Sequence, residues 1–217
     1  MAVFVVGLGV ALLPRVSTDK PPFDPDSVPG TQVVWVTAPA GEARGTLELW
    51  QRNRLRDWKR SFATPAWVGS EGISELAAEG RSFTPKGTFA LTEGFGRIPD
   101  PAARLPYIAI DRSNTWWWVS DVESPLYNRS FRCASPDCPF DTSLSENLGR
   151  TDPQYNHALV IDYNRFPAEP GAGSAFFVHG DIGRPTAGCV AVSEDVVRTL
   201  LATLQPSRKP VIGLYTS

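Results

Sequence analysis

The stretch that decides the fold covers residues 173–192 and reads GSAFFVHGDIGRPTAGCVAV. Its first part, residues 175–179, is apolar and ends at His179, a pattern typical of a buried strand. Glycine and proline then mark a loop over residues 180–185, and a second apolar segment follows Cys189. A chain that turns in this loop brings Cys189 back to the side of His179, ten positions earlier. The spacing therefore predicts that a thiol and an imidazole meet at one place in the fold.

The chemistry of Cys189 and His179 fits a nucleophile and its base. The thiolate is the reactive form of cysteine, and a free thiol with a pKa of ~8.5 is mostly protonated at pH 7, so a neighbouring histidine is needed to take the proton. Gly188 lacks a Cβ, which lets a carbonyl approach closely, and the N–H groups of Gly188 and Cys189 are candidates for binding an oxyanion. The alternative for Cys189 is a small core residue. His157, the other histidine, leads into an apolar segment and is interpreted as structural.

Residues 193–204 carry the pattern of a helix. Ser193 stands at the N-cap, acidic residues occupy the first turn, apolar residues recur at helical spacing, and Pro206 ends the segment. The other strong segments are short, and several alternate or are β-branched. We therefore predict strands at residues 32–37, 45–51, 88–92, 107–110, 116–119, 158–163, 175–179 and 190–192. The three tryptophans at residues 116–118 are interpreted as core packing, with a ligand surface as the alternative.

Composition supports one mainly β domain. The chain has 217 residues, of which 42% are hydrophobic and 20% charged, which argues against disorder, collagen and coiled coil. Its 18 glycines and 20 prolines suit short strands joined by turns. Lysine and arginine number 21 against 23 aspartates and glutamates, so the net charge of -2 disfavours a nucleic-acid partner. The sequence shows no nucleotide-binding glycine loop, and we expect no cofactor.

The first 30 residues differ from the rest of the chain. Residues 2–13 are uninterrupted apolar sequence, too short to span a bilayer as a helix, and are interpreted as the hydrophobic region of a signal peptide or anchor. A buried N-terminal strand is the alternative. Pro21, Pro22, Pro25 and Pro29 then indicate an extended linker. We predict a leader and linker over residues 1–30, a single domain over residues 31–217, and export of the protein.

Cys133 and Cys138 bracket the turn-forming residues Ala-Ser-Pro-Asp. Such a turn can bring the two Cα atoms within disulfide range, and an exported chain would oxidise them. Two free thiols, or half of a zinc site, are the alternatives, although zinc needs four ligands and no second Cys/His pair lies nearby. We expect a disulfide and no metal.

At the nucleophile the sequence resembles the L,D-transpeptidases of bacterial cell walls, which have a YkuD-type catalytic domain. The family motif is Ser/Thr-His-Gly-Cys after a catalytic histidine, and Thr186, Gly188, Cys189 and His179 match it. The motif histidine is replaced by Ala187. Two further departures are Ala191, where the family often has Arg or Asn, and a shorter gap between histidine and cysteine. The chain looks like a divergent branch with a Thr-x-Gly-Cys-Val motif. The resemblance covers about residues 67–214 and includes residues 84–89, 127–128, 145–148, 160–164 and 173–179.

The resemblance implies a mainly β fold, an L,D-transpeptidase-like β-sandwich or barrel with one short helix after the nucleophile. It also implies a reaction on peptidoglycan stem peptides. Cys189 would attack the bond between meso-diaminopimelate and D-Ala of a tetrapeptide stem, with His179 as base and then as proton donor. The thioester would pass to the amine of another stem, giving a 3-3 crosslink, or to water, giving L,D-carboxypeptidase activity. Carbapenems would acylate the same cysteine.

The remaining roles implied by the resemblance concern orientation and binding. The carbonyl of Gly180 is expected to orient the imidazole, with the Asp181 side chain as rival. Arg184 and Thr186 are expected to contact substrate, although an exposed loop arginine can also be merely solvated. The implied location is the bacterial cell envelope. A catalytically silent wall-binding domain is the alternative of a different class, and a sortase-like enzyme fits poorly because it needs a wider Cys–His spacing.

Overall fold

The structure is a computed structural model that describes residues 20–55, 57–98 and 102–217. The apolar run at residues 2–13, interpreted above as a signal region, lies outside the described residues. The fold is mainly β, as predicted. Its largest unit is a nine-stranded sheet. In sheet order the strands are β11 (Ala158–Ile161), β12 (Phe177–Gly180), β13 (Val190–Val192), β3 (Trp58–Trp67), β2 (Arg44–Arg52), β1 (Gln32–Ala38), β14 (Val211–Thr216), β6 (Gly87–Gly96) and β7 (Tyr107–Ala109).

The pairings of the main sheet close on themselves. Strand β6 pairs antiparallel with both β14 and β11, which joins the two ends of the order into a barrel-like ring and leaves β7 attached to β6. Strand β14 runs parallel to β1, and β13 runs parallel to β12. Closure of this kind leaves few open strand edges.

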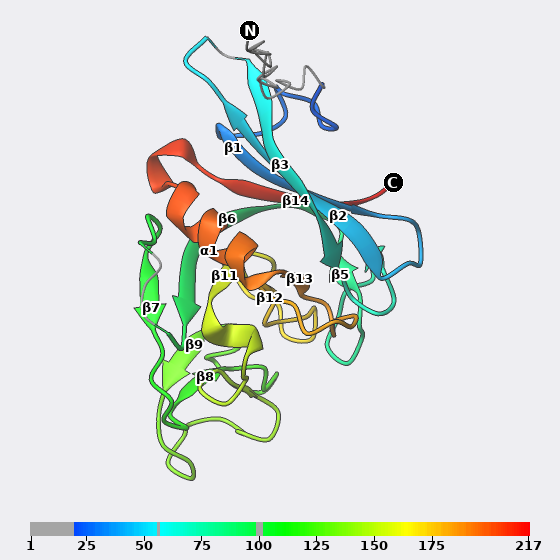
Figure 1. The fold of residues 1–217 in the computed structure, drawn as a ribbon. Coiled ribbons are helices and arrows are strands. Elements are labelled where there is room, and N and C mark those ends of the chain that lie inside the picture. The colour runs from blue at the N-terminus through cyan, green and yellow to red at the C-terminus, as the bar shows by residue number, and fades with distance from the viewer. Residues whose placement is uncertain (1–19, 56, 99–101) are drawn as a thin grey trace, which may run out of the picture.

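Two smaller sheets accompany the ring. A three-stranded sheet contains β10 (Glu146–Asn147), β8 (Trp116–Trp118) and β9 (Ser130–Arg132), and a two-stranded sheet contains β4 (Ile73–Ser74) and β5 (Thr84–Pro85). Two short 3-10 helices, η1 (Gln154–Asn156) and η2 (Pro206–Arg208), lie in connections. Figure 1 shows the strands β8 and β9 at the opposite end of the molecule from β1 and β3.

Strand β12 separates two apolar cores because successive side chains of a strand point to opposite faces. Val178 belongs to the larger core, which includes Leu47, Leu159 and Leu201. Phe177 belongs to a second core between the ring and the three-stranded sheet. His179 follows Phe177 by two positions and therefore points to the side of this second core, where Cys189 also packs.

The predicted helix is α1 (Glu194–Thr203), and it packs Val197, Leu200 and Leu201 into the larger core. Ser193 occupies the N-cap position, but its side chain makes no capping hydrogen bond, contrary to expectation. The Ser193 carbonyl instead accepts the N–H of Val197 within the first turn. In Figure 1 the helix lies beside β11 and β12, and it contacts both strands.

Phe23, in the segment predicted as a linker, packs on the ring. Its side chain is buried against Trp35, Trp50 and Trp58, with ring centroids 5.2–6.2 Å apart. The described part of the proline-rich segment is therefore anchored to the domain by one aromatic side chain. The domain boundary near residue 31 stays a prediction. Among the described residues, none of the helices has the length and apolar character needed to cross a membrane.

Candidate active site

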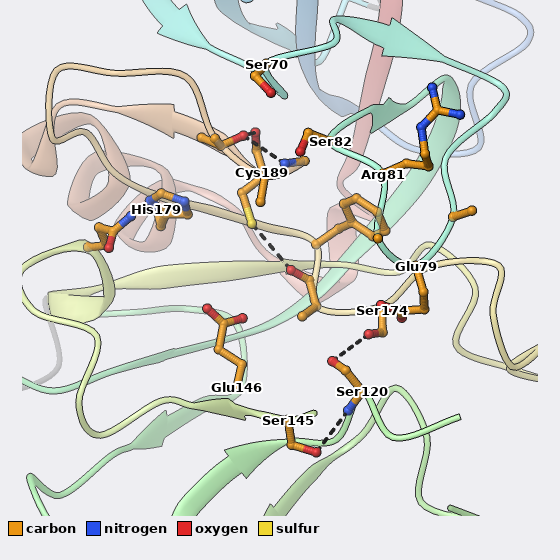
Figure 2. A pocket seen from close by; sticks show the side chains of 18 of the residues that line it. Ser70, Glu79, Arg81, Ser82, Ser120, Ser145, Glu146, Ser174, His179 and Cys189 are labelled. Atoms are coloured by element: carbon orange, nitrogen blue, oxygen red, sulfur yellow. Dashed lines mark hydrogen bonds between the residues drawn. The ribbon is translucent and has the colours of Figure 1, made fainter. Parts of the chain in front are cut away.

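A cavity of about 810 Å³ opens between the ring and the three-stranded sheet. His179 and Cys189 both line it, so the structure brings the predicted imidazole and thiol to one site. Figure 2 shows the two side chains on the same wall of the cavity. Serines supply much of the remaining lining, namely Ser70, Ser82, Ser120, Ser143, Ser145 and Ser174. A wall rich in hydroxyl groups suits a polar ligand such as a peptide.

His179 is held in one orientation by the main chain. Its side chain is buried, and Nδ1 lies 2.9 Å from the carbonyl oxygen of Gly180. A carbonyl oxygen only accepts hydrogen bonds, so Nδ1 carries the proton in the neutral ring and Nε2 keeps a free lone pair. Burial lowers the pKa of His179, against the opposing effects of the Gly180 carbonyl and the Asp181 charge. The imidazole is therefore neutral near pH 7 and able to accept a proton.

The two candidates for orienting His179 are separated by their hydrogen bonds. The Asp181 carboxylate accepts the N–H of Gly183 at 2.5 Å and lies on an exposed loop, whereas the Gly180 carbonyl contacts Nδ1 directly. A Cβ at Gly180 would lie 2.9 Å from Oε2 of Glu194. Glu194 in turn makes a short hydrogen-bonding contact with Nδ1 of His157, which is buried. His157 thus belongs to the packing behind the site.

Cys189 is half-buried and points its thiol at a backbone carbonyl. Its Sγ donates to the Ala175 oxygen at 3.3 Å. Burial raises the pKa of the Cys189 thiol, the Glu146 charge raises it further, and the Phe177 backbone N–H opposes both effects. The resting nucleophile is therefore a protonated thiol. Its activation requires a base, because little thiolate is present at neutral pH.

The turn before Cys189 is built around Gly188. Its φ of +145° is strained for other residues, and a Cβ would lie 2.6 Å from Cε1 of Phe176. The Gly188 N–H donates to the Thr186 hydroxyl at 3.1 Å, and this hydroxyl donates to the Cys189 carbonyl at 2.6 Å. The turn uses the Gly188 N–H in this structure, and its predicted role in binding an oxyanion stays a prediction. The role of Thr186 in substrate binding stays a prediction.

Thr84 anchors the same turn from a distant part of the chain. Its side chain is 0% exposed, accepts the Gly69 N–H at 2.8 Å and donates to the Gly188 carbonyl at 2.7 Å. One hydroxyl therefore joins β5 to the nucleophile turn and to the end of β3. The family resemblance included residues 84–89, but it assigned Thr84 no role.

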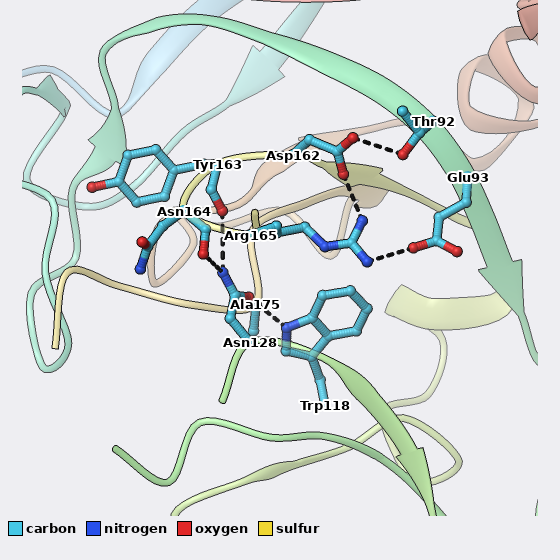
Figure 3. Close-up of polar contacts among 9 residues, drawn as sticks. All are labelled: Thr92, Glu93, Trp118, Asn128, Asp162, Tyr163, Asn164, Arg165 and Ala175. Carbon is cyan, nitrogen blue, oxygen red and sulfur yellow. Dashed lines mark hydrogen bonds and ion pairs between the residues drawn. The ribbon is translucent and has the colours of Figure 1, made fainter. Parts of the chain in front are cut away.

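Ala175, the acceptor for the thiol, is fixed by a buried network. It has a φ of +57°, and its N–H donates to Oδ1 of Asn128 at 3.2 Å. The same Oδ1 accepts the indole N–H of Trp118 at 2.8 Å, and Nδ2 of Asn128 donates to the carbonyls of Tyr163 and Asn164. Figure 3 shows Asn128 at the centre of these contacts. Asn128 therefore ties the loop that accepts the thiol hydrogen bond to Trp118 and to the backbone of residues 163–164.

Glu146 stands on the wall opposite Cys189 and was not predicted as a site residue. It comes from β10, and its Oε1 accepts the Tyr155 hydroxyl at 2.6 Å. Figure 2 shows its carboxylate pointing toward the space beside His179 and Cys189. The only sequence signal was its place in residues 145–148, a stretch of the family resemblance. Arg184 lies exposed at the cavity rim, as expected for a loop cation.

The other predicted features lie outside the cavity. Cys133 and Cys138 are joined by a disulfide, with Cα atoms 5.3 Å apart. Trp117 and Trp118 are buried, and Trp118 packs on Phe177 in the second core. Within the described residues, no group of three or more metal-ligating side chains comes together.

Comparisons with known proteins agree with this geometry. A family model, the YkuD L,D-transpeptidase catalytic domain, matches residues 42–212. No curated protein and no solved structure matches the chain. The matched segment covers most of the chain and includes His179, Cys189 and the cavity wall around them. The chain therefore belongs to the family of YkuD-type L,D-transpeptidase catalytic domains.

Proposed function

We propose that this chain is a cysteine-dependent L,D-transpeptidase that remodels peptidoglycan. The family acts on peptidoglycan peptides. The observation that carries the proposal is the orientation of His179: the Gly180 carbonyl holds Nδ1, and the ring lines the same cavity as Cys189. A buried core cysteine would need neither an oriented base nor an open cavity beside it. The substrate is the tetrapeptide stem, cleaved between meso-diaminopimelate and D-Ala.

In the first step His179 removes the thiol proton as sulfur attacks the peptide carbonyl. A base is required here because burial and the Glu146 charge raise the pKa of Cys189. The Cys189 N–H, the remaining donor of the pair suggested by the sequence, binds the oxyanion. The carbon–nitrogen bond then breaks, and His179 returns its proton to the amine of D-Ala. The product is a thioester on Cys189.

In the second step an acceptor resolves the thioester. The side-chain amine of another stem gives a 3-3 crosslink, and water gives a tripeptide. Arg184, exposed at the rim, is proposed to bind a stem carboxylate. Thiol acyl transfer of this kind requires no cofactor.

The departures from the family motif fall at two different places. Ala187 is exposed at the cavity rim, so the missing motif histidine alters substrate contacts and leaves the base, His179, in place. Ala191 is buried in β13 directly beside His179 in the parallel register. Neither position removes the thiol or the imidazole. Both departures are therefore compatible with catalysis.

We also propose that the protein works in the bacterial cell envelope. The Cys133–Cys138 disulfide supports an oxidising compartment. Export places the enzyme with its substrate.

The test incubates the full chain, and its Cys189→Ala and His179→Gln variants, with disaccharide tetrapeptide, and identifies products by mass spectrometry. A crosslinked dimer that lacks one D-Ala, formed only by the parent, is expected. Tripeptide alone would identify a hydrolase, and unchanged substrate would favour a wall-binding domain. A carbapenem should add its mass to the parent and not to Cys189→Ala; a parent mass unchanged after long incubation would count against the nucleophile.

A further inference from the structure

Glu146 places an acidic side chain near Cys189, where a negative charge hinders the first reaction step. It is half-buried in the cavity wall and faces Cys189 across the cavity (Figure 2). Its charge raises the pKa of the thiol, after the larger effect of burial. A negative charge here therefore opposes formation of the thiolate and of the oxyanion. Acylation alone gives no reason for this residue.

In the part of the chain that the structure describes, Glu146 has a hydrogen bond but no counter-charge. Within the described residues, its partner is the Tyr155 hydroxyl, and no lysine, arginine or histidine forms an ion pair with it. Tyr155 is itself buried and packs edge-on against His179, with centroids 5.6 Å apart. This contact fixes Oε1, and Oε2 remains for a ligand. A partly desolvated carboxylate without a cation favours a positively charged ligand group.

We propose that Glu146 binds the ammonium group of an amine acceptor and takes its proton as the amine attacks the thioester on Cys189. The inference rests on the proposed function and names the acceptor class, an amine rather than water. Water carries no charge and gains little from this carboxylate. An ammonium ion gains an ion pair, and its binding neutralises the charge that disfavours the oxyanion.

The protons of this second step balance. The ammonium gives one proton to Glu146, and the neutral amine forms a carbon–nitrogen bond with the thioester carbonyl. The carbon–sulfur bond breaks, and the second amine proton passes through His179 to the departing Cys189 sulfur. The products are an amide, a free thiol and a protonated Glu146, which returns its proton to water. Burial raises the pKa of Glu146, against the opposing Tyr155 hydrogen bond, which suits it to this task.

The first experiment measures charge selectivity without any peptidoglycan. Cys189 is the free cysteine of the chain, because the other two form the disulfide. We compare the rates at which it reacts with 2-aminoethyl methanethiosulfonate, which is cationic, and with methyl methanethiosulfonate, which is neutral. In both reactions the thiolate forms a disulfide and methanesulfinate leaves. The ratio of cationic to neutral rates should fall about tenfold or more in Glu146→Gln.

The matched control is Glu75→Gln. Glu75 is exposed and pairs with Lys86 on the surface, so its loss should leave the ratio unchanged. A second measurement needs no variant. In the parent the ratio should fall as the pH is lowered toward the raised pKa of Glu146, above the usual value of about 4.3. Thiolate formation affects both reagents equally and cancels from the ratio.

The second experiment measures the fate of the acyl-enzyme. With tetrapeptide donor and added stem acceptor, Glu146→Gln should lower the ratio of crosslinked product to tripeptide about tenfold or more, with no slowing of D-Ala release. An unchanged rate ratio with the two reagents would overturn the ammonium site, and an unchanged product ratio would overturn the acceptor role. A parent that shows charge selectivity but releases no D-Ala would refute the proposed function and leave the ammonium site standing.

Discussion

Replacing Thr84 with valine should destabilise the fold and disturb the nucleophile turn together. Valine keeps the β-branched shape but removes the hydroxyl that bonds the Gly69 N–H and the Gly188 carbonyl. Both backbone groups belong to buried residues, and each buried polar group left without a partner costs about 1–3 kcal/mol. The predicted loss of unfolding free energy is therefore about 2–6 kcal/mol, and each kcal/mol lowers the melting temperature by about 2–4 °C for a domain of this size.

The assay is urea and thermal denaturation of the parent and of Thr84→Val, with Thr64→Val as control. Thr64 is also a strand threonine, but its hydroxyl makes only an exposed 3.5 Å contact to Pro65. The control should change the free energy of unfolding by less than about 0.5 kcal/mol. Iodoacetamide alkylation of Cys189 should slow in Thr84→Val, because the turn loses its anchor. A stability loss no larger than that of the control would refute the anchoring role.

Three further predictions concern the network, the thiol and the disulfide. Asn128→Ala should lower the unfolding free energy by about 2–4 kcal/mol and slow alkylation of Cys189, since three half-buried backbone groups and the buried Trp118 indole lose a partner; an effect as small as that of the exposed Asn114→Ala would contradict this. Because the pKa of Cys189 is raised, its alkylation rate should still climb above pH ~8.5, and Glu146→Gln should move the profile to lower pH; a plateau below pH ~8.5 would disprove the raised pKa. The double variant Cys133→Ser and Cys138→Ser should lose only about 2 kcal/mol, because the closed loop is short, and should alkylate at Cys189 at the parental rate; a loss above about 4 kcal/mol would point to a larger structural role.

The sequence predicted the parts of the fold that local patterns determine. The apolar strands on either side of the loop at residues 180–185, and the helix after them, have periodicities that indicate their type. The predicted strand at residues 175–179 starts later, at Phe177, because Ala175 adopts a φ of +57° that no strand pattern reveals. The predicted strand at residues 158–163 ends at Ile161, where the Tyr163 N–H turns back to the Ile161 carbonyl.

Strands β3 and β14 were not predicted, for physical reasons. Most side chains of β3 are exposed or half-buried, and Pro65 lies inside it, so the apolar signal is weak. Strand β14 has six residues and is mostly apolar, but it follows Pro210, and its place is set by partners far away in the sequence. It pairs with β1 and β6, which close the ring around it. Closure of the ring depends on pairing between distant segments, so it cannot be predicted from a local sequence pattern.

The residues of the candidate site differ in the same way. Some could be predicted from nearby sequence, and others reach the site only through contacts between distant segments. His179, Gly180, Gly188 and Cys189 lie within eleven consecutive residues, so spacing alone was enough to place them together. Glu146 precedes them on a separate short strand, and its residue type suggests nothing beyond a solvated surface. Its contact with the cavity exists only because the three-stranded sheet packs against the ring.

Because of that packing, the main sheet and the three-stranded sheet both contribute residues to the site. The base is fixed to the ring by the Gly180 carbonyl, and the thiol bonds to the Ala175 carbonyl in the loop before β12, whereas Glu146 is carried by the three-stranded sheet. The two sheets meet through the second core, where Trp118 packs edge-on against Phe177 with centroids 4.9 Å apart. The three-stranded sheet also reaches the nucleophile, because Asn128 and Trp118 position the Ala175 loop whose carbonyl accepts the thiol. A change in that sheet therefore affects the proposed acceptor site and the resting thiol together, whereas the orientation of His179 depends on the Gly180 carbonyl of β12.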